Sequence, residues 1–175
     1  MAPDQVSTYE ERQEWRKEYL LANDLLVINM PKIELHVHIE GTMSPDMRWE
    51  LAQRNNIRLT AGSDERPLTT LAEVRDAYTK IRGRISKASA DASTFFTFFQ
   101  IYFGGFAMLK TEQDFYDLAM DYLKRVASTN VRYCEPFFDP QGHTCRGISM
   151  EVIMTAFKRA KRDAERDFDV SLVDW

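Results

Sequence analysis

The sequence of 175 residues has little cysteine and no long apolar run, and both shortages narrow the possible classes of protein. Its two cysteines, Cys134 and Cys145, are too few for the disulfide framework of a small secreted domain. The longest uncharged run near the start, residues 25–30, is far shorter than the roughly 20 apolar residues that span a bilayer, and it lacks the basic-then-apolar order of a signal peptide. We therefore expect a cytoplasmic protein with reduced thiols and no membrane partner.

Positive charge is also in deficit. Lys and Arg total 23 against 27 Asp and Glu, which gives a formal net charge of −4, and the basic residues are dispersed among the acidic ones. A protein that binds the phosphate backbone needs clustered positive charge, so nucleic acid is not an expected partner. With 44% hydrophobic residues and no internal repeat, the composition is that of an ordinary globular domain.

Changes in hydrophobic period along the chain predict alternating helices and strands. A helix is expected over residues 7–23, where Ser7 and Glu10 have the spacing of a capping box, and we assign residues 1–29 to a lead-in segment. Strands are expected at residues 33–39, 131–138 and 170–173. Helices are expected at residues 45–55, 70–80, 95–109, 111–126 and 149–167, with a loop at 60–67 and a polar connection at 82–93.

This order of elements leaves crossovers long enough for parallel strand pairing, and it predicts an α/β fold. A doubly wound sheet would place a glycine-rich phosphate turn after the first strand, where only Gly41 stands. A (β/α)8 TIM-type barrel fits the order, but such a barrel has eight strands and about 250 residues. We therefore interpret residues 30–175 as the N-terminal part of an incomplete TIM-type barrel. It would comprise the first two to three strands, with an α-rich insertion between strands 1 and 2.

The first expected strand divides its side chains by chemistry. Because successive strand residues point to opposite faces, we expect one face to carry only apolar side chains, those of Ile33, Leu35, Val37 and Ile39. The other face carries only ionisable ones, those of Glu34, His36, His38 and Glu40. In a parallel barrel we expect the apolar face to pack against helices and the ionisable face to line the interior, near the end of the strand where barrel active sites lie.

On that face His36 and His38 would stand side by side and could bind one Zn²⁺ at roughly 2.0–2.1 Å from each imidazole. The alternative is an antiparallel strand with a solvated face, on which two histidines bind nothing. Two ligands are also fewer than the three that a catalytic zinc site usually takes from protein. The third histidine, His143, follows the second strand in a loop that starts at Asp139, and we expect both residues at the mouth of the same site. For His143, a hydrogen bond to the backbone is the alternative.

Three segments carry a resemblance to a known family. Residues 30–42 (MPKIELHVHIEGT), 111–118 (TEQDFYDL) and 137–147 (FFDPQGHTCRG) resemble the adenosine and adenine deaminase family of amidohydrolase-type barrels. The likeness covers nearly everything from residue 30 onward, and the two flanking segments make it more specific than a paired histidine motif by itself. The first 25 or so residues carry no such signal.

The resemblance implies a hydrolase that removes the 6-amino group of a small purine as ammonia. His36 and His38 would be the first two ligands of one Zn²⁺, which lowers the pKa of bound water. Gly41 falls where the family brings its backbone close to the purine. Adenosine deaminases usually have Asp at the position of Glu40 and direct it toward the sugar. The longer Glu40 side chain, together with the FFDPQ-type segment, resembles the adenine deaminase branch and could occupy the room that ribose needs.

The aromatic stretch over residues 95–103 resembles the apolar wall of the family's pocket. On this basis Phe95 and Phe99 are candidate substrate-binding residues, with ordinary core packing as the alternative for each of them. The family has an E-x-R sequence in the second strand, whereas this chain has Glu135-Pro136-Phe137, so no arginine contact is carried over.

The family's third histidine ligand, general-acid glutamate, water-orienting histidine and metal-binding aspartate all come from later strands. We therefore assign no catalytic residue within this chain and expect it to be a fragment that is inactive alone, binds zinc poorly and aggregates. Two other functions stay open. One is a non-catalytic interaction module derived from a deaminase, and the other is a different metal hydrolase built on the same paired histidines.

Overall fold

The computed structural model describes residues 14–15, 25–61, 66–87, 99 and 101–173, and the chain divides into two compact units, Met1–Pro31 and Lys32–Trp175. In the first unit, the short helix α2 spans Leu25–Asn29. Most of the helix predicted for residues 7–23 lies outside the described residues. None of the helices within the described ranges combines the length and the apolar character needed to cross a membrane.

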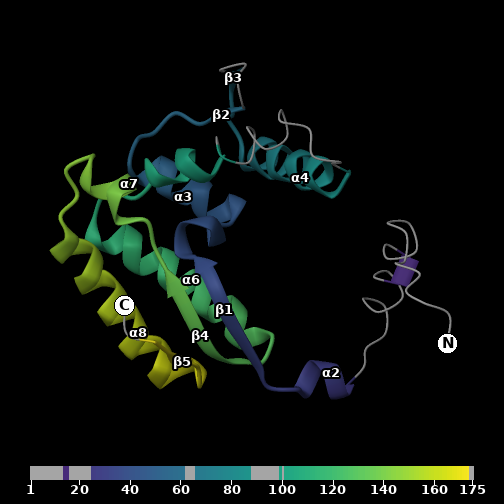
Figure 1. Ribbon diagram of the computed structural model, residues 1–175. Coiled ribbons are helices and arrows are strands. Elements are labelled where there is room, and N and C mark those ends of the chain that lie inside the picture. Colours follow the sequence, from purple (N-terminus) through teal and green to yellow (C-terminus); the bar gives the residue numbers. More distant parts are fainter. Residues whose placement is uncertain (1–13, 16–24, 62–65, 88–98, 100, 174–175) are drawn as a thin grey trace, which may run out of the picture. The chain divides into compact units, whose positions relative to one another are not determined.

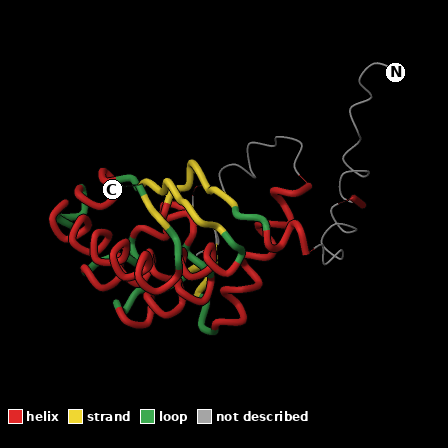
Figure 2. The backbone as a smooth tube through the Cα atoms, turned by 90° about the horizontal axis from the view of Figure 1, so that it is seen from below, coloured by secondary structure: helices red, strands yellow, loops and turns green. Residues whose placement is uncertain are grey.

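The second unit is built on a parallel three-stranded sheet. Its strands are β1 (Lys32–His38), β4 (Val131–Phe137) and β5 (Ser171–Leu172), in the spatial order β1-β4-β5. Both pairings are parallel, which confirms the predicted α/β class. The helices α6 (Glu112–Ser128) and α8 (Met150–Phe168) pack against each other, and Figure 2 shows the helices gathered on one face of these strands.

The connection from β1 to β4 is rich in helix, as predicted (Figure 1). It contains the 3-10 helix η1 (Ile39–Thr42), α3 (Pro45–Arg54), α4 (Leu71–Lys87) and a helical segment at residues 101–106 before α6. Two expectations are wrong here. The loop expected at 60–67 contains an antiparallel pair, β2 (Thr60–Ala61) and β3 (Arg66–Pro67). Residues 82–87, expected to be a polar connection, continue α4.

Helix starts agree with the local sequence signals. Ser44 caps α3 by accepting a hydrogen bond from the Met47 amide, and Thr111 forms a reciprocal capping box with Asp114 at the start of α6. The Ser149 hydroxyl caps α8 in the same way. After β4, however, the segment expected to be a loop forms the short helix α7 (Pro140–Thr144).

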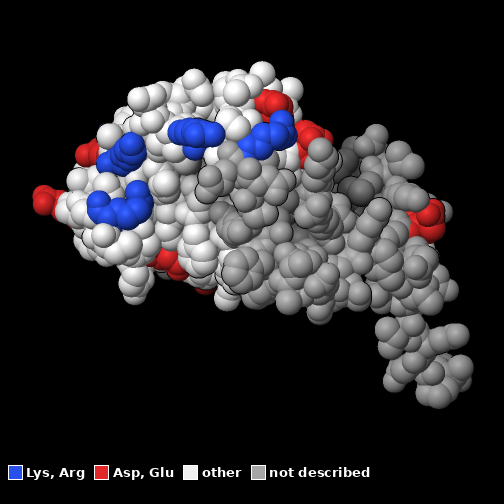
Figure 3. All heavy atoms as spheres, turned by 90° about the horizontal axis from the view of Figure 1, so that it is seen from above, with Lys and Arg blue, Asp and Glu red and all other residues white. Residues whose placement is uncertain are grey.

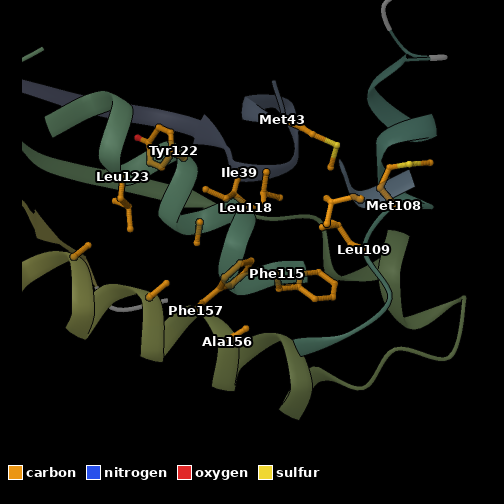
Figure 4. Packing of buried hydrophobic residues seen from close by; sticks show 14 of the residues in the cluster. Ile39, Met43, Met108, Leu109, Phe115, Leu118, Tyr122, Leu123, Ala156 and Phe157 are labelled. Carbon is orange, nitrogen blue, oxygen red and sulfur yellow. The ribbon is translucent and has the colours of Figure 1, made fainter. Parts of the chain in front are cut away.

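The core lies between the sheet and its helix layer (Figure 4). Ile39 of η1, Phe115 and Leu118 of α6, and Phe157 of α8 are fully buried, and the two phenylalanine rings meet edge to face at 6.0 Å. Each large apolar side chain buried in this way contributes about 1.5–3 kcal/mol relative to its exposed state. This packing fixes the carboxyl end of β1 against α6.

The predicted alternation along β1 is wrong in the first half of the strand. The Tyr122 hydroxyl of α6 donates a hydrogen bond of 2.7 Å to Glu34, so this carboxylate faces the helices, whereas Ile33 and Leu35 are 67% and 58% exposed. The cause is a bulge at His36, whose φ of 63° is left-handed and coincides with a register shift against β4. One irregular residue exchanges the two faces, so the predicted faces hold only beyond it.

Candidate active site

The two predicted metal-binding histidines do lie together, at the carboxyl end of β1. The ring centroids of His36 and His38 are 6.1 Å apart, and both rings meet Phe137 of β4 edge to face, at 5.0 and 4.2 Å. The parallel register pairs His38 with Phe137, which places this ring beside both imidazoles. The bulge at His36 therefore keeps the two histidines on one side of the strand even though it reverses the residues before them.

The surroundings of His38 indicate which of its nitrogens carries the proton. The Tyr102 hydroxyl donates a hydrogen bond of 2.7 Å to Asp139 Oδ2, which leaves the tyrosine oxygen as an acceptor. His38 Nδ1 lies 3.2 Å from that oxygen and 3.4 Å from Asp139 Oδ1. Because both neighbours accept, Nδ1 is the donor and Nε2 keeps its lone pair. Burial and the hydrogen bond to Asp139 raise the pKa of Tyr102 well above its ordinary value, so this hydroxyl stays protonated at neutral pH.

This arrangement fits a metal ligand. A histidine that binds a metal through one nitrogen commonly donates a hydrogen bond from the other nitrogen to a carboxylate or another acceptor. His38 Nδ1 is within hydrogen-bond distance of the Tyr102 hydroxyl, which is held by Asp139, and lies 3.4 Å from Asp139 Oδ1. His36 supplies the second imidazole of the pair. Within the described ranges, no cluster of three or more His, Cys, Asp or Glu side chains is arranged to hold a metal ion. The paired imidazoles of His36 and His38 are thus the candidate metal donors among the described residues.

Glu40 lies immediately beyond the strand in η1 and is 3% exposed. Its Oε1 accepts two hydrogen bonds of 2.9 Å, from the Asp139 amide and from His143 Nε2. Its Oε2 is buried and has no hydrogen-bond partner among the residues that the structure describes. A buried acceptor without a partner costs about 1–3 kcal/mol, so this oxygen calls for a donor from elsewhere.

A small cavity of about 70 Å³ adjoins this carboxylate. Glu40, Gly41 and Tyr102 are among its lining residues. A Cβ added at Gly41 would lie 3.5 Å from the Tyr102 ring, an ordinary van der Waals contact. A separate open concavity of about 780 Å³ is lined by His36 and Phe137 together with Leu35 and Glu135. Residues of β1 and β4 therefore border the larger concavity, whereas η1 and the segment at 101–106 border the small cavity.

His143 occupies a different environment from the one expected. The ring is fully buried, stacks on Phe106 at 4.8 Å and meets Phe115 edge to face at 4.9 Å. The alternative of a hydrogen bond to the backbone is wrong, because its two ring nitrogens contact the side chains of Glu40 and Arg146. Of the two residues expected at the mouth, Asp139 reaches His38 directly, whereas His143 lies behind Glu40.

The aromatic segment is only partly described. Phe99 is half-buried, and its ring stacks on that of Phe103 at 5.6 Å, while Phe95 lies outside the described residues. Tyr102 of the same segment reaches the candidate metal ligand, a contact that the sequence reasoning missed. The only available signal was a hydroxyl within an otherwise apolar stripe. Arg146 lies in the 137–147 segment that carries the resemblance, but no role was predicted for it.

Comparison with known proteins gives a consistent result. The family model described as adenosine deaminase matches residues 31–173. The chain is 41% identical over 142 residues to the adenine deaminase of Rhodospirillum rubrum, which covers 81% of this chain and 37% of that protein. The adenine deaminase of Sphingopyxis alaskensis is 34% identical over 169 residues, covering 97% of this chain and 41% of that protein. The chain thus spans well under half the length of these curated relatives.

Two solved structures share its arrangement of elements. The crystal structure of adenine deaminase from Arthrobacter aurescens matches with a TM-score of 0.65 at 36% identity, over 82% of this chain and 38% of that one. A cog1816 amidohydrolase from Burkholderia ambifaria, with bound Zn, matches with a TM-score of 0.66 at 26% identity, over 87% of this chain and 36% of that one.

Proposed function

We propose a function from one premise: this chain belongs to the adenosine deaminase family, and within it to the adenine deaminase-like branch. The family acts on the amino group of a purine. We propose that the whole protein, meaning a polypeptide of the relatives' length that contains this chain, converts adenine and water to hypoxanthine and ammonia. We further propose that the parallel sheet is the first part of a (β/α)8 barrel.

The paired imidazoles of His36 and His38 carry this proposal. They would hold one divalent metal ion, zinc by analogy with the neighbour that contains it. When bound, the metal lowers the pKa of a water molecule and so supplies hydroxide near neutral pH. Asp139 and Tyr102 keep the proton of His38 on Nδ1 and its lone pair on Nε2. The remaining metal ligands and the proton donor to the purine ring would come from the rest of the whole protein.

Glu40 supports adenine over adenosine as the substrate. Free adenine carries a ring N–H where adenosine carries ribose, and Glu40 Oε2 is a buried acceptor that lacks a donor among the described residues. An N–H donor from the base would satisfy this oxygen. A ribose at the same place would remove that donor and would have to enter the cavity of about 70 Å³ beside Glu40 and Gly41.

The test is ammonia release from adenine and from adenosine by the purified whole protein, with and without Glu40→Asp. We expect kcat/KM for adenine to exceed that for adenosine at least a hundredfold in the unaltered protein. The shorter carboxylate should reduce this ratio about tenfold or more, because a lost hydrogen bond to a charged group has about this effect. Comparable turnover of both substrates would contradict the role of Glu40, and ammonia from neither would contradict the proposed function.

A further inference from the structure

We propose that His143 and Arg146 act together as positioning residues that fix the orientation of the Glu40 carboxylate, so that Oε2 alone is presented to the ring N–H of the base. This inference rests on the proposed function for its ligand. It assigns a role to two residues that touch neither the candidate metal ligands nor the small cavity.

The neighbours of His143 determine which of its two ring nitrogens carries the proton. Arg146 Nη2 lies 2.9 Å from His143 Nδ1, and a guanidinium has only donors. Nδ1 must therefore accept, which leaves the ring proton on Nε2. That nitrogen lies 2.9 Å from Glu40 Oε1 and donates to it. Arg146 thus selects the form of His143 that can hold the carboxylate.

Packing holds the His143 ring in one position. His143 is fully buried between the rings of Phe106 and Phe115, so it has no alternative rotamer without loss of packing. A Cβ at the preceding residue, Gly142, would lie 2.0 Å from the Phe106 ring, so only glycine at this position lets the Phe106 ring pack against the backbone of α7. Arg146 is held in turn, because its Nε donates to the Gly142 carbonyl at 2.9 Å and its Nη2 to the Leu109 carbonyl at 3.3 Å.

The two oxygens of the Glu40 carboxylate differ in their hydrogen bonding. Oε1 accepts from both His143 and the Asp139 amide, so its two lone-pair directions are occupied. Oε2 stays without a donor among the described residues, and Glu40 lines the small cavity. A carboxylate held by only one of its oxygens offers the other in a fixed direction. Asp139 also contacts His38, so one short segment after β4 sets both the metal ligand and the acceptor.

The experiment compares His143→Phe with His143→Gln in the whole protein. Phenylalanine keeps a ring between Phe106 and Phe115 but removes the N–H, whereas glutamine restores an amide N–H near the position of Nε2. We expect His143→Phe to raise KM for adenine about tenfold to a hundredfold while kcat changes less than threefold, and His143→Gln to recover most of the loss. If His143 had only a packing role, the order of the two variants would be reversed, and His143→Gln would be the more damaging change.

A second measurement does not depend on activity. In the whole protein labelled with ¹⁵N-histidine, the chemical shifts of the two imidazole nitrogens report which one is protonated. We expect His143 as the Nε2–H form, and conversion toward the Nδ1–H form in Arg146→Gln. An Nδ1–H form in the unaltered protein would overturn the inference, as would an unchanged KM in His143→Phe of a protein that deaminates adenine. An unaltered protein inactive on adenine would instead contradict the proposed function, and the nitrogen shifts would still decide the inference.

Discussion

At the scale of single residues, the position of one proton separates the roles of two histidines. His38 lies beside two acceptors, Tyr102 and Asp139, so its Nδ1 carries the proton and its Nε2 is available to a metal. His143 lies beside the donor Arg146, so its Nε2 carries the proton and serves a carboxylate. The same side chain is thus a candidate ligand in one place and a positioning group in another, because of its neighbours.

Asp114 is a buried charge that the structure satisfies fully, and it allows a prediction about acid stability. Its carboxylate accepts hydrogen bonds from Arg54, Asn55 and the amides of Lys110 and Thr111. Burial alone would raise the pKa of Asp114, but the hydrogen bonds from Asn55 and the two amides lower it below the ordinary 3.8. Because the pKa is depressed on folding, this stabilisation is present above about pH 4 and is lost as the pH falls through the folded value.

We therefore expect Asp114→Asn to lower the free energy of unfolding of the whole protein by about 2–4 kcal/mol at pH 7. Urea unfolding followed by circular dichroism measures this, and the difference from the unaltered protein should shrink below pH 4. Asp117→Asn is the matched control, since Asp117 pairs with the same Arg54 at 2.7 Å but is partly exposed. It should cost less than about 1 kcal/mol. Equal losses in both variants would refute the distinction.

The chemical types of the site were readable from the sequence, but their geometry was not. His36, His38 and Glu40 stand out as ionisable residues that alternate with apolar ones in the sequence. The left-handed backbone of His36 has no sequence signal, because such a conformation in a non-glycine residue depends on its tertiary surroundings. The exchange of faces between Glu34 and Leu35 follows from that one residue, so period-two reasoning failed there.

At the scale of elements, helix starts were predictable and short pairings were not. Ser44, Thr111 and Ser149 cap their helices through contacts three residues away, which sequence alone can indicate. The pair β2–β3 joins strands of two residues each, too short for any periodic pattern. Helix α4 continues through residues 82–87 despite a glycine and a serine, because single weak helix formers do not end a helix.

Helix α7 gives a prediction at this scale, through its packing on the segment at 101–106. A Cβ at Gly142 would lie 2.0 Å from the buried Phe106 ring. Gly142→Ala should therefore displace this ring and lower the free energy of unfolding by about 2–3 kcal/mol, measured by urea unfolding. Gly41→Ala is the control, because its Cβ would lie 3.5 Å from the Tyr102 ring, an ordinary van der Waals distance. This substitution should change the free energy of unfolding by less than about 0.5 kcal/mol. A harmless Gly142→Ala would show that α7 does not pack as described.

At the scale of the whole molecule, the described helices of the second unit cover one face of the sheet, and large apolar side chains lie exposed on its strands. Ile33 and Leu35 are more than half exposed on β1, and Phe137 is 36% exposed on β4. Large exposed apolar side chains that lie together are typical of a surface that packs against other protein. On the face drawn in Figure 3, Lys and Arg form separate groups divided by uncharged surface, in keeping with the dispersed charge read from the sequence.

The parallel class and the helix-rich connection were predictable because strand and helix patterns alternate along the chain. The barrel itself stays a prediction, since it depends on strands outside this sequence. The exposed apolar residues and the two-donor metal site have the same explanation under the proposed function. Under that proposal, the other strands of a protein of the relatives' length would cover these residues and supply the other metal ligands.

We propose above that His36 and His38 bind a metal that adenine deamination requires. The most direct test measures bound zinc and ammonia release from adenine together, in the whole protein, in its His36→Ala/His38→Ala variant and in the 175-residue chain alone. We predict about one zinc per molecule and ammonia release in the whole protein, and loss of both in the variant and in the isolated chain. Undiminished ammonia release by the zinc-free variant, or zinc-dependent release by the isolated chain, would contradict the account.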